Sequence, residues 1–170
     1  MNIAETFAQN TRIQKTFGKN YNVINNIEMT KPIAKATPLA EIIKSLGFTV
    51  VEYDSNTFQE SIADNAEDKT IFINAFDSPF RKRYDTAYLL GVALQPDATR
   101  NEHLAFAADL LMPEATIKLA VSDYVENLGK SALTFPEFGK MIKALSSIFE
   151  INPHAIDLRL HQILGTDLYY

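Results

Sequence analysis

Residues 80 to 95 form the segment that most constrains how this chain can fold, because they are apolar on nearly every side after a basic entry. Such a segment predicts a helix that is buried among other elements. Ser78 and Pro79 precede it, and an N-cap Ser followed by Pro in the first turn is a typical helix start. We therefore expect a helix here, with the rest of the chain packed around it.

The basic entry consists of Arg81, Lys82 and Arg83. Cations in the first turn are unfavourable with the helix dipole, so their presence needs a reason. Two interpretations stay open. Either these are solvated charges, with Arg83 holding a neighbouring loop, or they form a basic rim beside a groove that receives an acidic segment of a partner.

The remaining pattern predicts a small sheet and several helices. Apolar runs at residues 48–53 and 70–74 predict two strands, the second apolar enough to be central, and the polar stretch 54–69 predicts a loop or a weak edge element. Helices are expected at residues 37–46, 102–113, 113–128, 134–149 and 152–164. The predicted fold class is α+β, with a small β-sheet packed on a mostly helical body.

Several helix ends carry local signals. Thr37 is expected to cap a helix that begins at Pro38, and Gly47 is expected to stop it. Thr134 and Glu137 have the spacing of a capping box, in which the two residues satisfy each other's backbone amides.

Residues 1 to 36 are expected to form an N-terminal arm ahead of one globular domain at 37–170. Ile3, Phe7, Ile13 and Phe17 could line a short helix before an Asn-rich stretch. The arm either packs against its own domain or docks a partner.

Composition limits the classes of function. A formal net charge of −5 argues against a protein that grips nucleic acid through bulk electrostatics. The absence of Cys rules out disulfides and thiolate metal sites. The first residues lack a signal-peptide pattern, and no apolar run approaches the ~18 residues of a membrane span. We therefore expect a cytoplasmic protein.

Two blocks of sequence carry more specific patterns. The first, from Arg83 to Leu94, reads RYDTAYLLGVAL, and the second, from Glu102 to Pro113, reads EHLAFAADLLMP. They resemble ImmA/IrrE-type zinc metallopeptidases, whose segments look like R-F-T-x-A-H-E-L-G-H-A-L and E-A-N-x-F-A-A-x-L-L-M-P. The identical positions are Arg83, Ala87, Leu90, Gly91, Ala93, Leu94, Glu102, Phe106, Ala107, Ala108, Leu110, Leu111, Met112 and Pro113.

The resemblance extends over about residues 37 to 164, because Ala155 and Arg159-Leu160 also keep the spacing of the family's last helix. It implies a zincin-like metallopeptidase scaffold. The small Ala pair of the second block is expected to let its helix pack closely on the helix at 80–95.

The residues that perform the family's chemistry are replaced. In His-Glu-x-x-His, two imidazoles on one helix face hold Zn²⁺ and the Glu activates the bound water. Here Tyr88, Leu89 and Val92 stand at those positions. A phenol that titrates near ~10 is a poor ligand, and Leu and Val can neither bind metal nor move protons. Glu102 alone occupies the position of the family's third ligand, so we expect no catalytic residue, no metal and no cofactor.

The three histidines do not suggest a replacement metal site. His154 and His161 lie seven residues apart on one predicted helix, a rise of about 10 Å that is too long for a shared ion. His103 directly follows Glu102, so on a helix the two side chains diverge by about 100°.

Members of the family look like regulators that cleave or antagonise helix-turn-helix repressors. The resemblance therefore implies recognition without cleavage. We expect a pseudopeptidase, encoded by a phage or mobile element, that binds a regulatory protein such as a helix-turn-helix repressor. The expected partner-binding groove contains Arg83, Tyr84, Tyr88 and Glu102.

Two of these residues have open alternatives. Tyr88 either fills the emptied metal cavity, with its hydroxyl bonded to Glu102, or lies at the groove floor as an aromatic anchor. Glu102 is either a hydrogen-bonding core residue or a groove acid.

Two rival functions also remain. One is an active enzyme with an atypical site around Glu102. The other is a nucleic-acid-binding regulator that uses Arg81, Lys82 and Arg83 together with the final helices.

Overall fold

The computed structural model describes residues 36–54, 62–63 and 68–164. The predicted N-terminal arm therefore lies almost entirely outside the described residues. Within these ranges the chain forms six helices and a small sheet, which confirms the α+β prediction. The elements are α4 (Leu39–Ser45), β1 (Thr49–Tyr53), β2 (Ile62–Ala63), β3 (Thr70–Asn74), α5 (Pro79–Leu94), α6 (Arg100–Leu111), α7 (Glu114–Asn127), α8 (Phe135–Phe149) and α9 (Pro153–Leu164). None of the helices in these ranges is long and apolar enough to cross a bilayer.

The sheet has the strand order β1-β3-β2, so β3 is central as predicted. β1 runs parallel to β3, with Val50 opposite Ile71, and β2 pairs with β3 in the antiparallel sense. Ile71 and Ile73 of β3 are buried because alternate residues of a strand point to the same face. β2 is a two-residue edge strand within the polar stretch that was predicted to be a loop or weak edge element.

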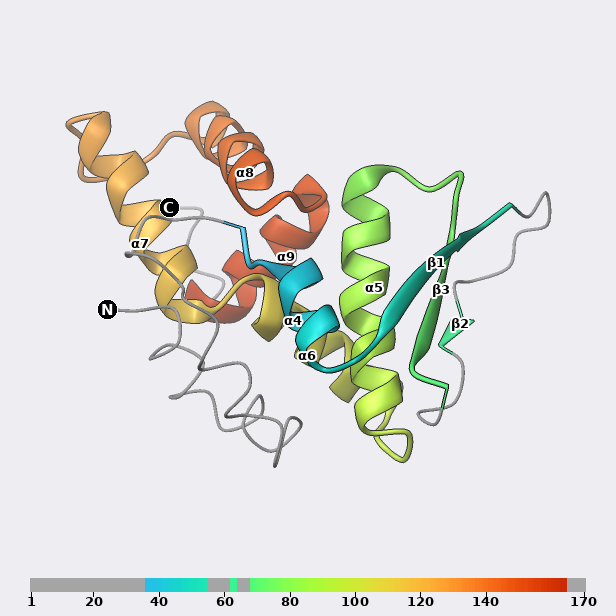
Figure 1. Ribbon diagram of the computed structural model, residues 1–170. Coiled ribbons are helices and arrows are strands. Elements are labelled where there is room, and N and C mark those ends of the chain that lie inside the picture. Colours follow the sequence, from blue (N-terminus) through green and yellow to red (C-terminus); the bar gives the residue numbers. More distant parts are fainter. Residues whose placement is uncertain (1–35, 55–61, 64–67, 165–170) are drawn as a thin grey trace.

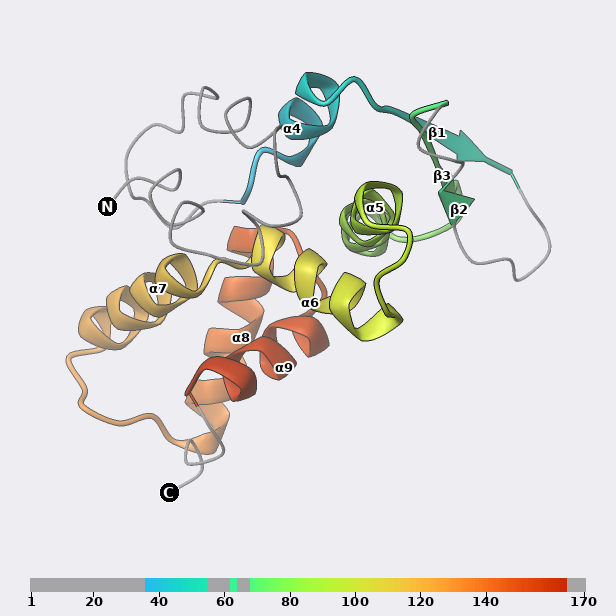
Figure 2. The same ribbon diagram turned by 90° about the horizontal axis from the view of Figure 1, so that it is seen from below.

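Helix α5 lies between the sheet and the other helices (Figure 1, and from below in Figure 2). Its start follows the prediction, since the Ser78 hydroxyl accepts a hydrogen bond from the Arg81 amide. The helix is less enclosed than predicted. Leu90 and Ala87 are fully buried, whereas Tyr84 and Tyr88 stay partly exposed because one side of α5 is left open.

The contact between α5 and α6 is close because α5 has a glycine where α6 presents a ring. A Cβ added at Gly91 would lie 2.6 Å from Cδ1 of Phe106, which is itself buried. Ala107 and Ala108 of α6 are also buried, as the prediction of close packing requires. The small residues thus let the two backbones approach each other.

Helix α9 is tied to α6 by a buried ion pair. Nη2 of Arg159 lies 2.6 Å from Oδ1 of Asp109, and both side chains are only 9% exposed. Nε of Arg159 also donates a hydrogen bond to the Met112 carbonyl at the end of α6. These contacts fix the position of α9 against the helix that packs on α5.

The first helix starts differently from the prediction. Pro38, not Thr37, is the N-cap residue of α4, and no side chain caps this end. The Thr37 hydroxyl instead donates to the Leu110 carbonyl, 2.8 Å away on α6. A long-range partner has therefore replaced the expected local one, and it anchors the chain before α4 to the helical body.

The capping box of α8 is confirmed. The Glu137 carboxylate accepts hydrogen bonds from the amide and the hydroxyl of Thr134. The side chain of Lys130 also bonds to Glu137, and these contacts with Lys130 and Thr134 hold the pKa of Glu137 down to about 2.

Candidate functional site

The open side of α5 forms one wall of a pocket of about 470 Å³. α6 supplies a second wall, and the segment that starts α9 supplies the third. The lining residues are Phe80, Arg81, Tyr84, Asp85, Tyr88, Leu89, Arg100, Leu104, Asn152, His154 and Ala155. A concave site of this size, with an apolar lining and a few polar groups, has the general character of a ligand-binding site.

Helical spacing explains which residues of α5 reach the pocket. Phe80, Tyr84 and Tyr88 are four residues apart, so their side chains lie one above another on the same face. Arg100 and Leu104 have the same spacing on α6 and face this stripe. Two walls of the pocket are thus helix faces brought together by the α5–α6 contact.

Tyr84 is a partly buried polar group of the pocket lining. Its hydroxyl donates a hydrogen bond of 3.4 Å to the Leu104 carbonyl. Burial raises the pKa of Tyr84, the nearby Asp85 raises it further, and Arg159 opposes the shift. The hydroxyl therefore stays protonated at neutral pH and acts as a donor.

Tyr88 packs against a buried histidine. Its ring stands edge-on to that of His103, with centroids 5.9 Å apart and planes at 88°. Nε2 of His103 lies 2.8 Å from the Gln95 carbonyl oxygen, so it is the ring nitrogen placed to donate a proton. The expected hydroxyl bond from Tyr88 to Glu102 is replaced by this ring contact, and the partly exposed Tyr88 ring lines the pocket.

Glu102 lies outside the pocket lining. It is exposed at the start of α6, where its carboxylate accepts hydrogen bonds of 2.8 Å from both the amide and the hydroxyl of Thr99. This is the second half of a capping box, because the Thr99 hydroxyl in turn accepts from the Glu102 amide. Glu102 is therefore neither a core residue nor an acid of the groove, the two alternatives left open by the sequence. It is a surface residue that caps α6.

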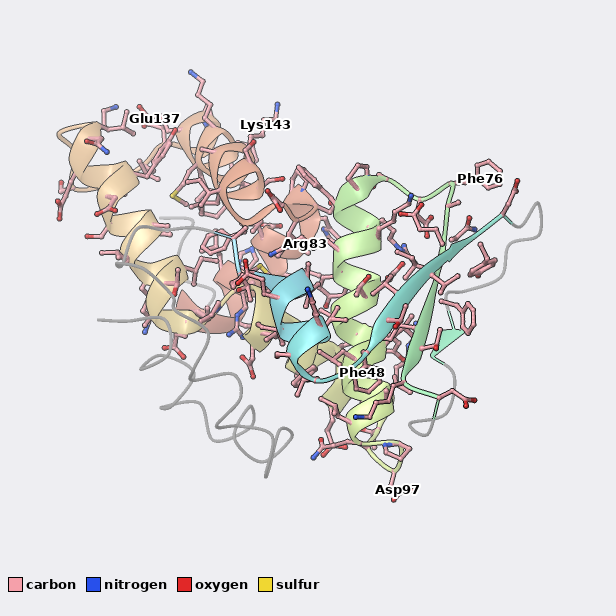
Figure 3. All side chains as sticks on the ribbon, in the orientation of Figure 1. Phe48, Phe76, Arg83, Asp97, Glu137 and Lys143 are labelled. Carbon is pink, nitrogen blue, oxygen red and sulfur yellow. The ribbon has the colours of Figure 1, made fainter. Side chains whose placement is uncertain are left out.

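Arg83 also lies away from the pocket. One residue along a helix turns the side chain by about 100°, so Arg83 leaves the face that carries Tyr84. Its side chain is labelled in Figure 3. Its guanidinium donates to the Thr37 carbonyl next to α4 and lies 3.6 Å from the Glu150 carboxylate. Burial lowers the pKa of Arg83, and Glu150 opposes that shift. The interpretation in which Arg83 holds a neighbouring segment matches this geometry.

The basic entry of α5 is largely neutralised by carboxylates. The ion pairs are Arg81 with Asp85 at 2.8 Å, Lys82 with Glu52 at 2.7 Å and Arg83 with Glu150 at 3.6 Å. Cations that already face carboxylates are less available to phosphates. The entry therefore does not form a free basic patch.

The positions expected for zinc ligands do not fit a metal. Tyr88 lines the pocket, Leu89 is buried at 4% exposure and Val92 is half-buried. Among the described residues, no three His, Asp or Glu side chains gather closely enough to hold an ion. His161 instead lies 3.5 Å from Asp157, one turn away on α9. This donor set does not match the nitrogen and carboxylate ligands that zinc takes.

The structure thus brings together Tyr84 and Tyr88 from the predicted groove, and separates Arg83 and Glu102 from them. Residues of α6 and α9 that line the pocket were not predicted. The four-residue spacing of Phe80, Tyr84 and Tyr88 is a sequence signal that could have added Phe80 to the predicted groove. No local signal places Arg100 or His154 beside it, because only tertiary packing does so.

A scan of the chain against protein-family models found no match, and a search of curated proteins found none either.

Proposed function

We propose that this chain is a non-catalytic pseudopeptidase of the ImmA/IrrE type that binds a segment of a regulatory protein, such as a helix-turn-helix repressor, in the pocket between α5, α6 and α9. The observation that carries the proposal is the composition of the pocket. It combines the open aromatic stripe Phe80, Tyr84 and Tyr88 with an apolar floor at Leu89. Partly exposed aromatic side chains over an apolar floor are typical anchors of protein interfaces.

The ionisable side chains of the pocket lining support binding without cleavage. The pocket offers Arg81, Asp85, Arg100 and His154 as ionisable side chains besides its two tyrosines. Asp85 is engaged by Arg81 at 2.8 Å, so it is not poised as a free base. Hydrolysis of a peptide bond needs an activated water and a group that stabilises the oxyanion, and the single carboxylate of the lining is already paired with Arg81.

The two rival functions receive less support. An enzyme built around Glu102 would need an available carboxylate, but Glu102 accepts two hydrogen bonds in the cap of α6. A nucleic-acid-binding face at the start of α5 would need unpaired cations, and the three there face carboxylates.

Site-specific photo-crosslinking tests the proposal. Leu104, which is partly exposed in the pocket, is replaced by p-benzoylphenylalanine, and Lys143 on α8, outside the lining, is replaced in a control protein (Figure 3). Both proteins are irradiated in lysate of the organism that encodes the chain. We expect the pocket position, and not the α8 position, to capture a DNA-binding regulator that mass spectrometry identifies.

Two variants make the test specific. Tyr88→Ala removes a pocket ring and should lower the yield of the captured regulator by about tenfold or more, the loss typical of an interface anchor. Glu102→Ala changes the cap of α6, outside the pocket lining, and should leave the yield nearly unchanged. Capture of the regulator equally at both crosslinking positions, or equal loss in both variants, would contradict the proposal.

A further inference from the structure

The floor of the pocket is suited to large apolar side chains. Leu89 is 4% exposed at its base, and the rings of Phe80 and Tyr88 together with Leu104 form its sides. A volume of about 470 Å³ lies within the range of sites that hold small ligands. The pocket therefore takes a few side chains of a short segment, and not a whole element such as a helix pair.

The rim of the pocket carries an excess of positive charge. Arg81 and Asp85 neutralise each other across 2.8 Å, which leaves Arg100 as the cation that is not balanced by a carboxylate of the lining. Within the described part of the chain, the side chain of Arg100 makes neither a hydrogen bond nor an ion pair. The exposed His154 also lines the pocket and brings no negative charge to it.

This local charge is opposite to that of the whole molecule. The chain has a formal net charge of −5, so the molecule as a whole repels acidic segments. A positive rim over an apolar floor reverses that preference at one place. Complementary potentials of this kind select partners and their orientation more than they add affinity.

We propose that the pocket recognises a short acidic segment in which one bulky apolar side chain, aromatic or Leu, stands beside an Asp or Glu. The apolar side chain lies on the floor at Leu89 beside the Tyr88 ring, and the neighbouring carboxylate pairs with Arg100. This inference rests on the function proposed above and specifies its partner. It also implies that a DNA-binding partner is engaged away from its own basic, DNA-contacting face.

Selection from a random library of 12-residue peptides displayed on phage tests this inference. The immobilised full-length protein is the bait, and peptides that also bind Tyr88→Ala are removed. We expect the pocket-dependent peptides to be enriched in Asp or Glu next to Phe, Tyr, Trp or Leu. A synthetic peptide of the enriched sequence, labelled with fluorescein, then gives Kd by anisotropy.

Charge variants examine the role of Arg100 directly. Arg100→Glu should raise the Kd of the labelled acidic peptide by about five- to tenfold. This is the effect expected when an exposed ion pair is replaced by a repulsion between like charges. The substitution is compatible with the fold, because a Glu in the first turn of α6 is favourable with the helix dipole. Lys143→Glu on α8 changes the net charge equally at an exposed position outside the lining, and should leave Kd nearly unchanged. Circular dichroism confirms that each variant is folded.

The outcomes separate the two proposals. Pocket-dependent peptides without acidic residues, or with Lys or Arg beside the apolar side chain, would overturn the acidic specificity and leave pocket binding in place. Equal weakening by Arg100→Glu and Lys143→Glu would overturn it too, because the effect would then be one of net charge. If no peptide depends on the pocket, and crosslinking at position 104 captures no regulator, both proposals are wrong.

Discussion

At the scale of single residues, the pair of Arg159 and Asp109 contributes to the position of the third pocket wall. Arg159 lies in α9, whose first residues line the pocket, and Asp109 lies in α6. Both side chains are 9% exposed, so each charge has lost most of its water and depends on the other. Removing one partner leaves an uncompensated buried charge.

We predict that Arg159→Leu lowers the free energy of unfolding by about 3–5 kcal/mol, the usual cost of breaking a buried pair on one side. Urea unfolding followed by circular dichroism measures this loss. Replacing both residues, with Asp109→Leu added, should recover part of it because no lone charge then remains.

The matched control is Lys118→Leu, which breaks an ion pair with Glu114 whose side chains are 49% and 58% exposed. This change should cost less than about 1 kcal/mol, as for most surface pairs. If Arg159→Leu costs no more than Lys118→Leu, the buried pair does not hold α9 in place.

At the scale of the elements, the crossing of α5 and α6 depends on the missing side chain at Gly91. Ala normally stabilises a helix interior over Gly by about 1 kcal/mol. Here its Cβ would lie 2.6 Å from the buried ring of Phe106, and overpacking costs about 1–3 kcal/mol. We predict a net loss of stability of up to about 2 kcal/mol for Gly91→Ala in urea unfolding.

Gly139→Ala in α8 gives the opposite expectation, because nothing lies within 4 Å of a Cβ built there. Without a clash, only the helix propensity remains, and the variant should be more stable by up to about 1 kcal/mol. If Gly91→Ala is more stable than the wild type, as Gly139→Ala is expected to be, the α5–α6 contact does not restrict position 91.

Elements with local signals could be predicted from the sequence. The Ser78 cap, the capping box of Thr134 and Glu137, and the central strand β3 all appear where the pattern indicated them. The interactions that determine these elements involve residues only a few positions apart in the sequence. Thr37 was assigned wrongly because its hydroxyl finds a partner 73 residues away, on α6, which no local pattern reveals.

The candidate site could be predicted only in part for the same reason. Tyr84 and Tyr88 belong to one face of one helix, so a motif read along the chain finds them together. The motif also included Arg83, although a side chain one residue away points to another face. Arg100 and His154 reach the pocket through the packing of α6 and α9, and that packing is set by contacts distant in sequence.

At the scale of the whole molecule, the expected loss of metal binding can be tested by the thermal stability of the intact chain. We predict that neither EDTA nor added ZnCl₂ changes the melting temperature of the purified protein. Specific binding to the folded state would raise it by mass action. The physical reason is the donor set, since Tyr88, Leu89 and Val92 stand where the predicted resemblance would place metal ligands and base.

A melting temperature that rises with zinc and falls with EDTA would contradict this prediction. Comparison with Glu102→Gln would then show whether the remaining carboxylate at the expected third position takes part.

The pocket has walls from residues as far apart as Phe80 and Ala155, so it exists only when these segments have folded together. An unfolded chain therefore lacks the proposed binding site, and occupancy by the proposed ligand would shift the equilibrium toward the native state. At a ligand concentration of 100 times Kd the shift is about 2.7 kcal/mol, a large part of the stability of an ordinary domain. Since proteases in a cell remove chains through their unfolded state, the supply of partner would set how long this protein survives and how much of it accumulates.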